Sequence, residues 1–227
     1  MRKKIILLTV VLTSSMMVSA QKFSGGIFVN PSLSWMKPDV AKNISNEGMK
    51  LGFSYGALGD LNIIGDNFSL NLGILVNNFG GKISYADSIP SFETLDSIYA
   101  FNKGAIVDYK LTYVELPIGL KGKTNEIGYM TYYMKAGISP MFKWKAKADV
   151  TQGNISGESI KKEVSSFALG FYVGGGFQYN LGGSTSLVTE LVFTNGLTDI
   201  TKTKVVGKDK TDKVILNNIA LRVGIIF

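Results

Sequence analysis

Histidine and cysteine are both absent from the 227-residue sequence. Without histidine, a hydrolase that uses a histidine base is excluded, and so is a metal site built on imidazole or thiolate ligands. Without cysteine there is neither a disulfide framework nor a lipoprotein attachment site. No calcium loop of the spaced Asp-x-Asp-x-Asp type occurs either. We therefore expect a non-enzymatic protein with no cofactor and no metal.

Long apolar runs and a concentrated basic patch are also missing. Beyond the first 20 residues, no stretch reaches the roughly 18 consecutive apolar residues that a membrane helix needs. The formal net charge is +7, but three of the basic residues are Arg2, Lys3 and Lys4, and the other lysines are scattered along the chain. This distribution gives no indication of a nucleic-acid partner.

The first 20 residues have the pattern of a secretory signal peptide. A basic start at 2–4 precedes an apolar run at 5–12, and Val18-Ser19-Ala20 forms a small-residue cleavage pattern. An uncleaved membrane anchor is the alternative, but the apolar run is too short to span a bilayer as a helix. We predict a signal peptide at 1–20 and a single domain at 21–227.

The last segment, 214–227, alternates between apolar and mixed positions. Its odd positions are large and apolar except for Asn217, whereas its even positions include Asn218, Arg222 and Gly224. Because successive side chains of a strand point to opposite faces, the segment predicts a strand with one apolar and one mixed face. The strands of a transmembrane barrel have this pattern, since their outer face meets lipid.

Similar alternation predicts eight strands, at 23–35, 49–57, 68–76, 105–121, 132–144, 167–181, 187–193 and 214–227. The connections after the first, third, fifth and seventh strands are long and polar, and the others are short. Gly59-Asp60 and Gly65-Asp66-Asn67 are typical turn residues. Outer-membrane barrels have short periplasmic turns and long extracellular loops. The prediction is an all-β, eight-stranded antiparallel up-and-down transmembrane β-barrel in the cell outer membrane, with both termini in the periplasm.

A soluble eight-stranded barrel of the lipocalin type is an alternative, because alternation does not say which face is inside. Two features favour the membrane. The polar parity is dominated by Gly, Ser, Asn, Thr and Ala rather than by the Lys and Glu of a solvated face. Aromatic residues cluster near strand ends, as they do at membrane interfaces; these are Trp35, Tyr129, Tyr132, Trp144, Phe193 and Phe227. We therefore expect apolar residues such as Leu221 and Val223 to face lipid.

Pro117 lies inside the fourth predicted strand, where the apolar parity also changes. The apolar positions are odd up to Tyr113 and even from Leu116 onward. Proline within a sheet is typical of an edge or a bulge. We predict a β-bulge near 113–115 that reconciles the two halves, with Glu115 facing the lumen because a lipid-facing carboxylate is costly.

The run Tyr113-x-Glu115-x-Pro117, followed by Lys121, resembles the fourth-strand motif of the PorT-like family of outer-membrane barrels. The resemblance extends to the layout of signal, eight strands and terminal Phe227, and it implies an integral outer-membrane protein. Phe227 with its alternating apolar neighbours is also similar to the C-terminal signature that the barrel-insertion machinery reads. The resemblance to an outer-membrane barrel implies outer-membrane lipid and the insertion machinery as partners. Since the founding member of the family is tied to secretion and gliding, the resemblance also implies envelope or secretion-system proteins as partners.

Four charged residues fall on the lumen parity of the fourth, fifth, seventh and eighth strands: Glu115, Lys135, Glu190 and Arg222. Side chains just fill an eight-stranded barrel, and charges buried there must pair. We predict an ion-pair network centred on Arg222 and Glu190, which are neighbours across adjacent strands. Residues 174–176, three glycines in mid-strand, indicate close side-chain packing across the lumen. The network indicates a structural plug; the alternative is a small porin or a lipid- or ligand-binding barrel.

Overall fold

A computed structural model describes residues 23–38, 44–153, 155–203 and 213–227. The predicted signal peptide at 1–20 lies outside these residues. The described residues contain no helix that is long and apolar enough to cross a membrane.

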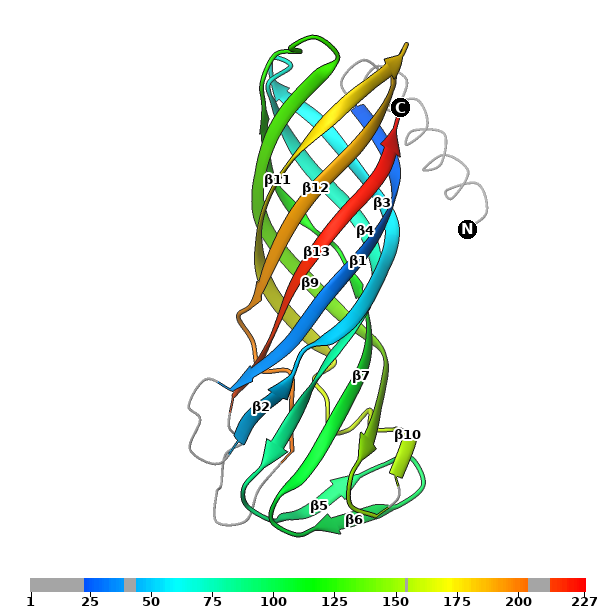
Figure 1. Cartoon of the computed structure of the whole chain (residues 1–227), viewed down its shortest axis with the longest axis vertical. Coiled ribbons are helices and arrows are strands. Elements are labelled where there is room, and N and C mark those ends of the chain that lie inside the picture. Colours follow the sequence, from blue (N-terminus) through cyan, green and yellow to red (C-terminus); the bar gives the residue numbers. More distant parts are fainter. Residues whose placement is uncertain (1–22, 39–43, 154, 204–212) are drawn as a thin grey trace, which may run out of the picture.

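Nine strands form the wall of a closed barrel (Figure 1). They are β1 (Phe23–Pro38), β3 (Lys50–Ile64), β4 (Phe68–Tyr85), β7 (Ala105–Glu115), β8 (Ile118–Lys123), β9 (Met130–Val150), β11 (Phe167–Gly182), β12 (Thr185–Gly196) and β13 (Val214–Ile226). Because β7 and β8 share one place between β4 and β9, the wall has eight positions. All these neighbours are antiparallel, and β13 closes the ring by pairing with both β12 and β1. The predicted up-and-down barrel is confirmed.

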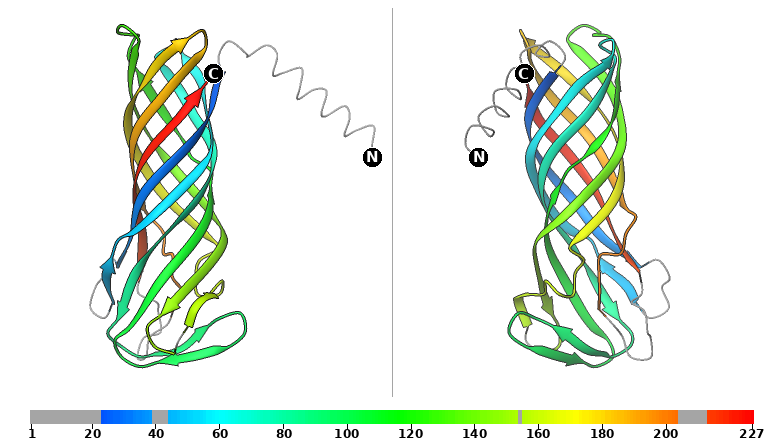
Figure 2. Two further views of the ribbon diagram at one scale, coloured as in Figure 1. Left: turned by 45° about the vertical axis from the view of Figure 1, so that its right-hand side comes forward. Right: turned by 180° about the vertical axis from the view of Figure 1, so that it is seen from behind.

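The two ends of the barrel differ (Figure 2). We call the end that carries the tight connections and the C-terminus the turn end; its connections include Gly65 and Gly183, both with positive φ. The opposite end, the loop end, carries four short strands, β2 (Ile44–Gly48), β5 (Ile89–Glu93), β6 (Ile98–Phe101) and β10 (Ile155–Ser159). The sequence predicted polar connections in those places, and it ended the third strand at 76 although β4 continues to Tyr85.

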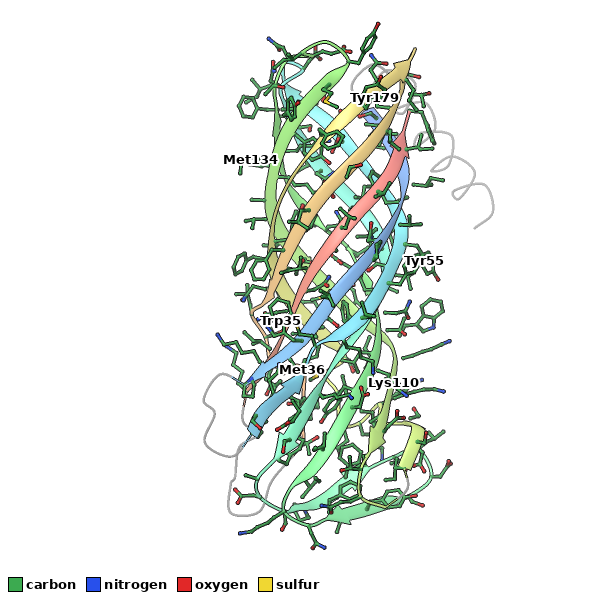
Figure 3. All side chains as sticks on the ribbon, viewed as in Figure 1. Trp35, Met36, Tyr55, Lys110, Met134 and Tyr179 are labelled. Atoms are coloured by element: carbon green, nitrogen blue, oxygen red, sulfur yellow. The ribbon has the colours of Figure 1, made fainter. Side chains whose placement is uncertain are left out.

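An apolar band surrounds the barrel from the turn end to beyond its middle. Among its outward side chains are Ile27, Val29, Leu33, Leu51, Phe53, Tyr55, Ile74, Ile118, Leu120, Met134, Ile138, Leu191 and Leu221. Leu221 is 46% exposed, whereas its neighbour Arg222 is 5% exposed and points inward. Tyr55 and Met134 project away from the wall (Figure 3). The expectation that the apolar parity faces outward is confirmed here, and the lipocalin alternative is wrong for this part of the molecule.

Three strands, β4, β7 and β9, continue past the apolar band. We call the part that they form at the loop end the extension. With 18 residues in β4 and 21 in β9, these strands exceed the roughly 9–11 residues that a membrane crossing needs. Within the extension the polarity is inverted, since Tyr109 and Leu111 are buried inside while Lys110 points outward (Figure 3). Its interior is a single apolar cluster that includes Met36, Ile83, Tyr85, Phe92, Phe101, Val107, Tyr109, Leu111, Ile160 and Ile200.

The predicted bulge at 113–115 is wrong. In β7 and β8 the odd positions remain inward from Ala105 to Lys121. The apolar parity changes there because the strand passes from the extension, with its apolar interior, into the apolar band, with its apolar exterior. The register shift lies in the neighbouring strand β9, where Thr112 pairs with Lys145 and Tyr113 pairs with Lys143, leaving Trp144 as the extra residue.

Candidate functional site

A cluster of charged side chains fills the lumen inside the apolar band. Glu190 accepts from Lys135 Nζ at 2.6 Å and from Arg222 Nη1 at 2.8 Å, both at Oε1. The Tyr133 hydroxyl donates to Oε2 of the same carboxylate at 2.7 Å. Glu190 and Arg222 are directly opposite in the β12–β13 register, which brings their side chains together. All four residues are at most 5% exposed, so the carboxylate exchanges water for three donors.

Glycines in β11 make room for this cluster. Gly176 stands opposite Tyr133 on one side and Glu190 on the other. A Cβ atom at Gly176 would lie 2.2 Å from the Thr189 carbonyl oxygen and 2.6 Å from the Glu190 Cβ, so no larger residue fits without movement of the backbone. The run at 174–176 therefore allows side chains from both neighbouring strands to occupy the lumen.

A second ion pair lies beside the first. Lys121 Nζ donates to Asp60 Oδ2 at 2.6 Å, and Asn71 Nδ2 donates to Oδ1 of the same carboxylate at 2.6 Å. Lys121 Nζ also lies 4.1 Å from the centroid of the Tyr133 ring, which connects the two ion pairs. The sequence assigned Asp60 to a turn because it follows Gly59; the structure places it inside β3, facing the lumen.

Glu115 does not join the network with Glu190, contrary to the prediction. Its carboxylate accepts hydrogen bonds from Asn77 Nδ2 and from Ser139 Oγ. Alternation placed Glu115 on the lumen face, but it could not say at which level along the barrel axis the side chain lies. Together with the two ion pairs, Glu115 gives the lumen three buried carboxylates, and Lys121, Lys135 and Arg222 give three cations. The formal charge of the described lumen therefore sums to zero.

The other motif residues have structural partners. The Tyr113 hydroxyl donates to the Ser165 carbonyl oxygen at 2.6 Å, and its ring stacks on Phe79 with 5.9 Å between centroids. Pro117 lies in the break between β7 and β8, where it has no amide hydrogen to donate. Phe227 continues the pairing with β1, because its amide donates to the Gly25 carbonyl at 2.9 Å, and its side chain is 62% exposed.

Both the lumen and the loop end are closed. A cavity of about 10 Å³ lies among the lumen side chains, enough for about one water molecule. Toward the loop end the apolar cluster of the extension covers the charged layer. Within that cluster the Tyr85 and Tyr109 hydroxyls lie 2.7 Å apart, and burial raises the pKa of Tyr109 to about 12. Among the described residues, packed side chains therefore fill the lumen and cover it at the loop end.

At the loop end, a buried carboxylate accepts hydrogen bonds from two segments that lie far apart in the sequence. Glu163 is 6% exposed; it accepts from the Glu93 amide at 2.9 Å and from Thr203 Oγ1 at 2.6 Å. Among the described residues, no group of three or more acidic side chains is arranged to hold a metal ion. The sequence did not identify this contact, because Glu163 falls in a polar stretch with no periodicity.

Three solved structures illustrate what the chain is similar to, one of them the outer membrane protein OprG. The Neisserial surface protein A has 13% sequence identity and a TM-score of 0.47, with 89% of this chain and 97% of that chain covered. OprG from Pseudomonas aeruginosa has 12% identity and a TM-score of 0.45, with 90% and 95% covered. The attachment invasion locus protein Ail of Yersinia pestis, in complex with the heparin analogue sucrose octasulfate, has 16% identity and a TM-score of 0.40, with 91% and 99% covered.

No curated protein matches the chain. Residues 19–203 match the family described as outer membrane protein beta-barrel domain, which covers most of the sequence and includes all wall strands except β13. The chain therefore belongs to the outer membrane protein beta-barrel domain family, and its place is the outer membrane.

Proposed function

We propose that this protein is a non-enzymatic outer-membrane barrel of the PorT-like type, whose lumen is a structural plug and whose extension is the part that contacts other envelope or secretion-system proteins. The observation that carries the proposal is the closed interior. Two carboxylates of the lumen form ion pairs, the third accepts hydrogen bonds from Asn77 and Ser139, the cavity among the lumen side chains measures about 10 Å³, and an apolar cluster covers the charges at the loop end. Such an interior supports the wall and presents a rigid surface at the loop end.

The proposed orientation places the loop end outside the cell and the turn end, with both termini, in the periplasm. The short connections at the turn end and the long ones at the loop end support it. We also propose that 1–20 is removed as a signal peptide and that Phe227 is read by the insertion machinery. The exposed side chain of Phe227 at the strand end is compatible with that role.

A planar-bilayer recording tests the closed lumen. The purified barrel should give no steady conductance, while a known porin measured under the same conditions should conduct. Steady single-channel steps from the barrel would contradict the plug and favour the alternative of a small porin.

Single-cysteine labelling tests the orientation, because the natural chain contains no cysteine. Ser97→Cys at the loop end should react with a membrane-impermeant maleimide on intact cells. Asp66→Cys at the turn end should react only after the outer membrane is opened. Both positions are exposed, so a reversed pattern would mean a reversed orientation.

A further inference from the structure

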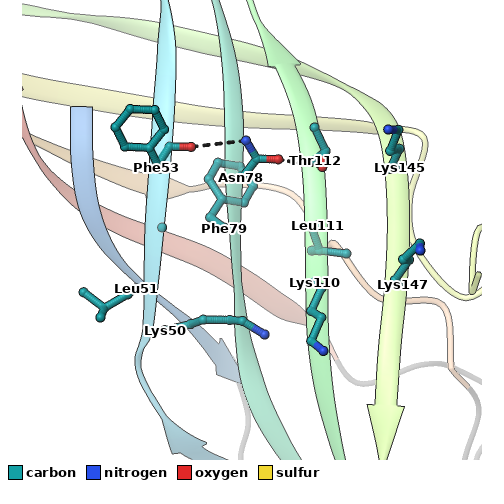
Figure 4. Close-up of a pocket in the computed structure, with 11 residues that line it drawn as sticks. Lys50, Leu51, Phe53, Asn78, Phe79, Lys110, Leu111, Thr112, Lys145 and Lys147 are labelled. Atoms are coloured by element: carbon teal, nitrogen blue, oxygen red, sulfur yellow. Dashed lines mark hydrogen bonds between the residues drawn. The ribbon is translucent and has the colours of Figure 1, made fainter. Parts of the chain in front are cut away.

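An open groove lies on the outer wall where the apolar band meets the extension (Figure 4). Its volume is about 470 Å³, and it crosses β3, β4, β7 and β9. The residues that matter for its chemistry are Lys50, Leu51, Phe53, Lys110, Lys145 and Lys147. We call this feature the basic groove.

The basic groove forms where β3 separates from β4. The pairing of these strands ends at Phe53 and Asn78, after which β3 continues beside β1 as far as Lys50. Asn78 Nδ2 reaches the Phe53 carbonyl at 3.4 Å across the end of the pairing (Figure 4). Two residues further along β4, toward the loop end, the Gly80 amide donates to the Ser34 hydroxyl at 3.0 Å, and this hydroxyl donates to the Gly80 carbonyl at 2.9 Å. On this edge β2 pairs with β4 only from Lys82 onward, so the stretch between Asn78 and Lys82 has no neighbouring strand there, and Ser34 satisfies the amide and carbonyl of Gly80 within it.

One wall of the basic groove is apolar and continuous with the apolar band. Leu51 is 83% exposed and Phe53 is 47% exposed, and both point outward from β3. Side chains this exposed and apolar are compatible with hydrocarbon as their surroundings. An acyl chain that lies along the barrel can therefore reach the groove without leaving the band.

The opposite wall is cationic. Lys145 is paired in register with Thr112, and Lys147 with Lys110. The basic side chains therefore lie in successive rows on the loop-end side of the band. Lys50 and Lys110 form ion pairs with Asp108 and Asp149. Within the described part of the chain, Lys145 and Lys147 form no ion pair, and Lys145 Nζ lies 5.5 Å from the centroid of the Trp144 ring.

We propose that the basic groove binds the phosphate headgroup of an anionic lipid from the surrounding leaflet. The phosphate contacts Lys145 and Lys147, and the start of the acyl chain packs on Leu51 and Phe53. Long lysine side chains at a membrane interface carry their charge to the headgroup level, where anionic phosphates concentrate. The groove opens sideways onto the apolar band, which suits a lipid better than a soluble anion. This inference rests on the proposed placement of the loop end at a membrane surface.

Reconstitution followed by native mass spectrometry tests the inference. The barrel is placed in bilayers of phosphatidylcholine with increasing fractions of phosphatidylglycerol, and the lipids that remain bound are counted. The wild-type barrel should retain phosphatidylglycerol in preference to phosphatidylcholine. Lys145→Gln/Lys147→Gln should weaken that retention by about 30-fold, since each lysine near an anionic surface contributes about fivefold.

The matched control is Lys103→Gln/Lys161→Gln, which removes two exposed lysines of the loop end outside the groove. It should change retention by less than about twofold, because neither lysine lines the groove and exposed charges are screened by salt. Equal losses in both double variants, or no preference for phosphatidylglycerol in the wild type, would overturn the inference. A barrel that fails to float with the bilayers would instead overturn the proposed membrane placement.

Discussion

The apolar band and the extension are built from the same strands but have opposite polarity. In β7 the inward residues Tyr109 and Leu111 are apolar and Lys110 is outside, whereas in β8 Lys121 is inside and Leu120 is outside. Along β7 and β8 the backbone continues from one region to the other with its alternation unchanged, whereas β9 changes parity at Trp144. The comparison teaches that the medium around a strand, and not the strand itself, decides which face is apolar.

The largest expected effect concerns the residue at which β9 changes parity. Deleting Trp144 removes the extra residue of the bulge, so one half of β9 would present its wrong face, either Lys135 to lipid or Ala146 and Ala148 to solvent. We expect no folded barrel. Trp144→Ala keeps the register and should cost only about 1–2 kcal/mol. Heat-modifiable migration on SDS gels distinguishes the two, and equal folding would show that the bulge does not separate the regions.

The buried carboxylate of the lumen comes next. Glu190→Leu leaves Lys135 and Arg222 without their shared acceptor, so we expect a loss of about 3–5 kcal/mol in the free energy of unfolding. Arg222→Met should cost less, since Lys135 still neutralises Glu190.

The compensating variant for this network is the triple change Lys135→Met/Glu190→Leu/Arg222→Met. A double change that includes Glu190 would still leave one buried cation without an acceptor. Urea unfolding in lipid vesicles should find the triple variant more stable than Glu190→Leu alone. If the triple variant is the less stable one, paired charge is not what holds the lumen together.

A charge on the outer face should separate the two regions directly. Leu221→Arg places a cation in the apolar band and should cost about 2–4 kcal/mol near the bilayer midplane. Lys110→Leu makes the reverse exchange on the outside of the extension and should cost less than about 1 kcal/mol, the range of an exposed ion pair. Similar costs in urea unfolding would mean that both outer faces meet the same medium.

The smallest effect is the pH dependence of the extension. Burial raises the pKa of Tyr109 from its ordinary value of 10.0 to about 12, so the folded state holds its proton where the unfolded state releases it. The contribution of Tyr109 to the free energy of unfolding is complete below pH 10.0 and is lost as the pH rises toward 12. Tyr109→Phe should therefore flatten the fall in stability at high pH, measured by urea unfolding across that range. An unchanged slope would place the titration elsewhere.

Much of the membrane part could be predicted from alternation. The outward position of Leu221 and the inward position of Arg222 follow from a period of two in 214–227, and the register that joins Arg222 to Glu190 follows from their adjacent strands. Asp60 was missed because Gly59 before it suggests a turn, although the strand continues through both. Glu115 was placed on the right face, but alternation contains no information about depth in the lumen.

The sequence by itself determined that each wall strand has two different faces, that the strands follow one another as antiparallel neighbours, and that certain charges share the inner face. Only the tertiary structure decided where the apolar face changes from outside to inside, which strand carries the bulge, and that Lys121 pairs with Asp60. The physical reason is that the alternation of side chains between the two faces of a strand is a local property, set by neighbours along the chain. Depth, register and pairing depend on residues far apart in sequence, which meet only when the ring of strands closes.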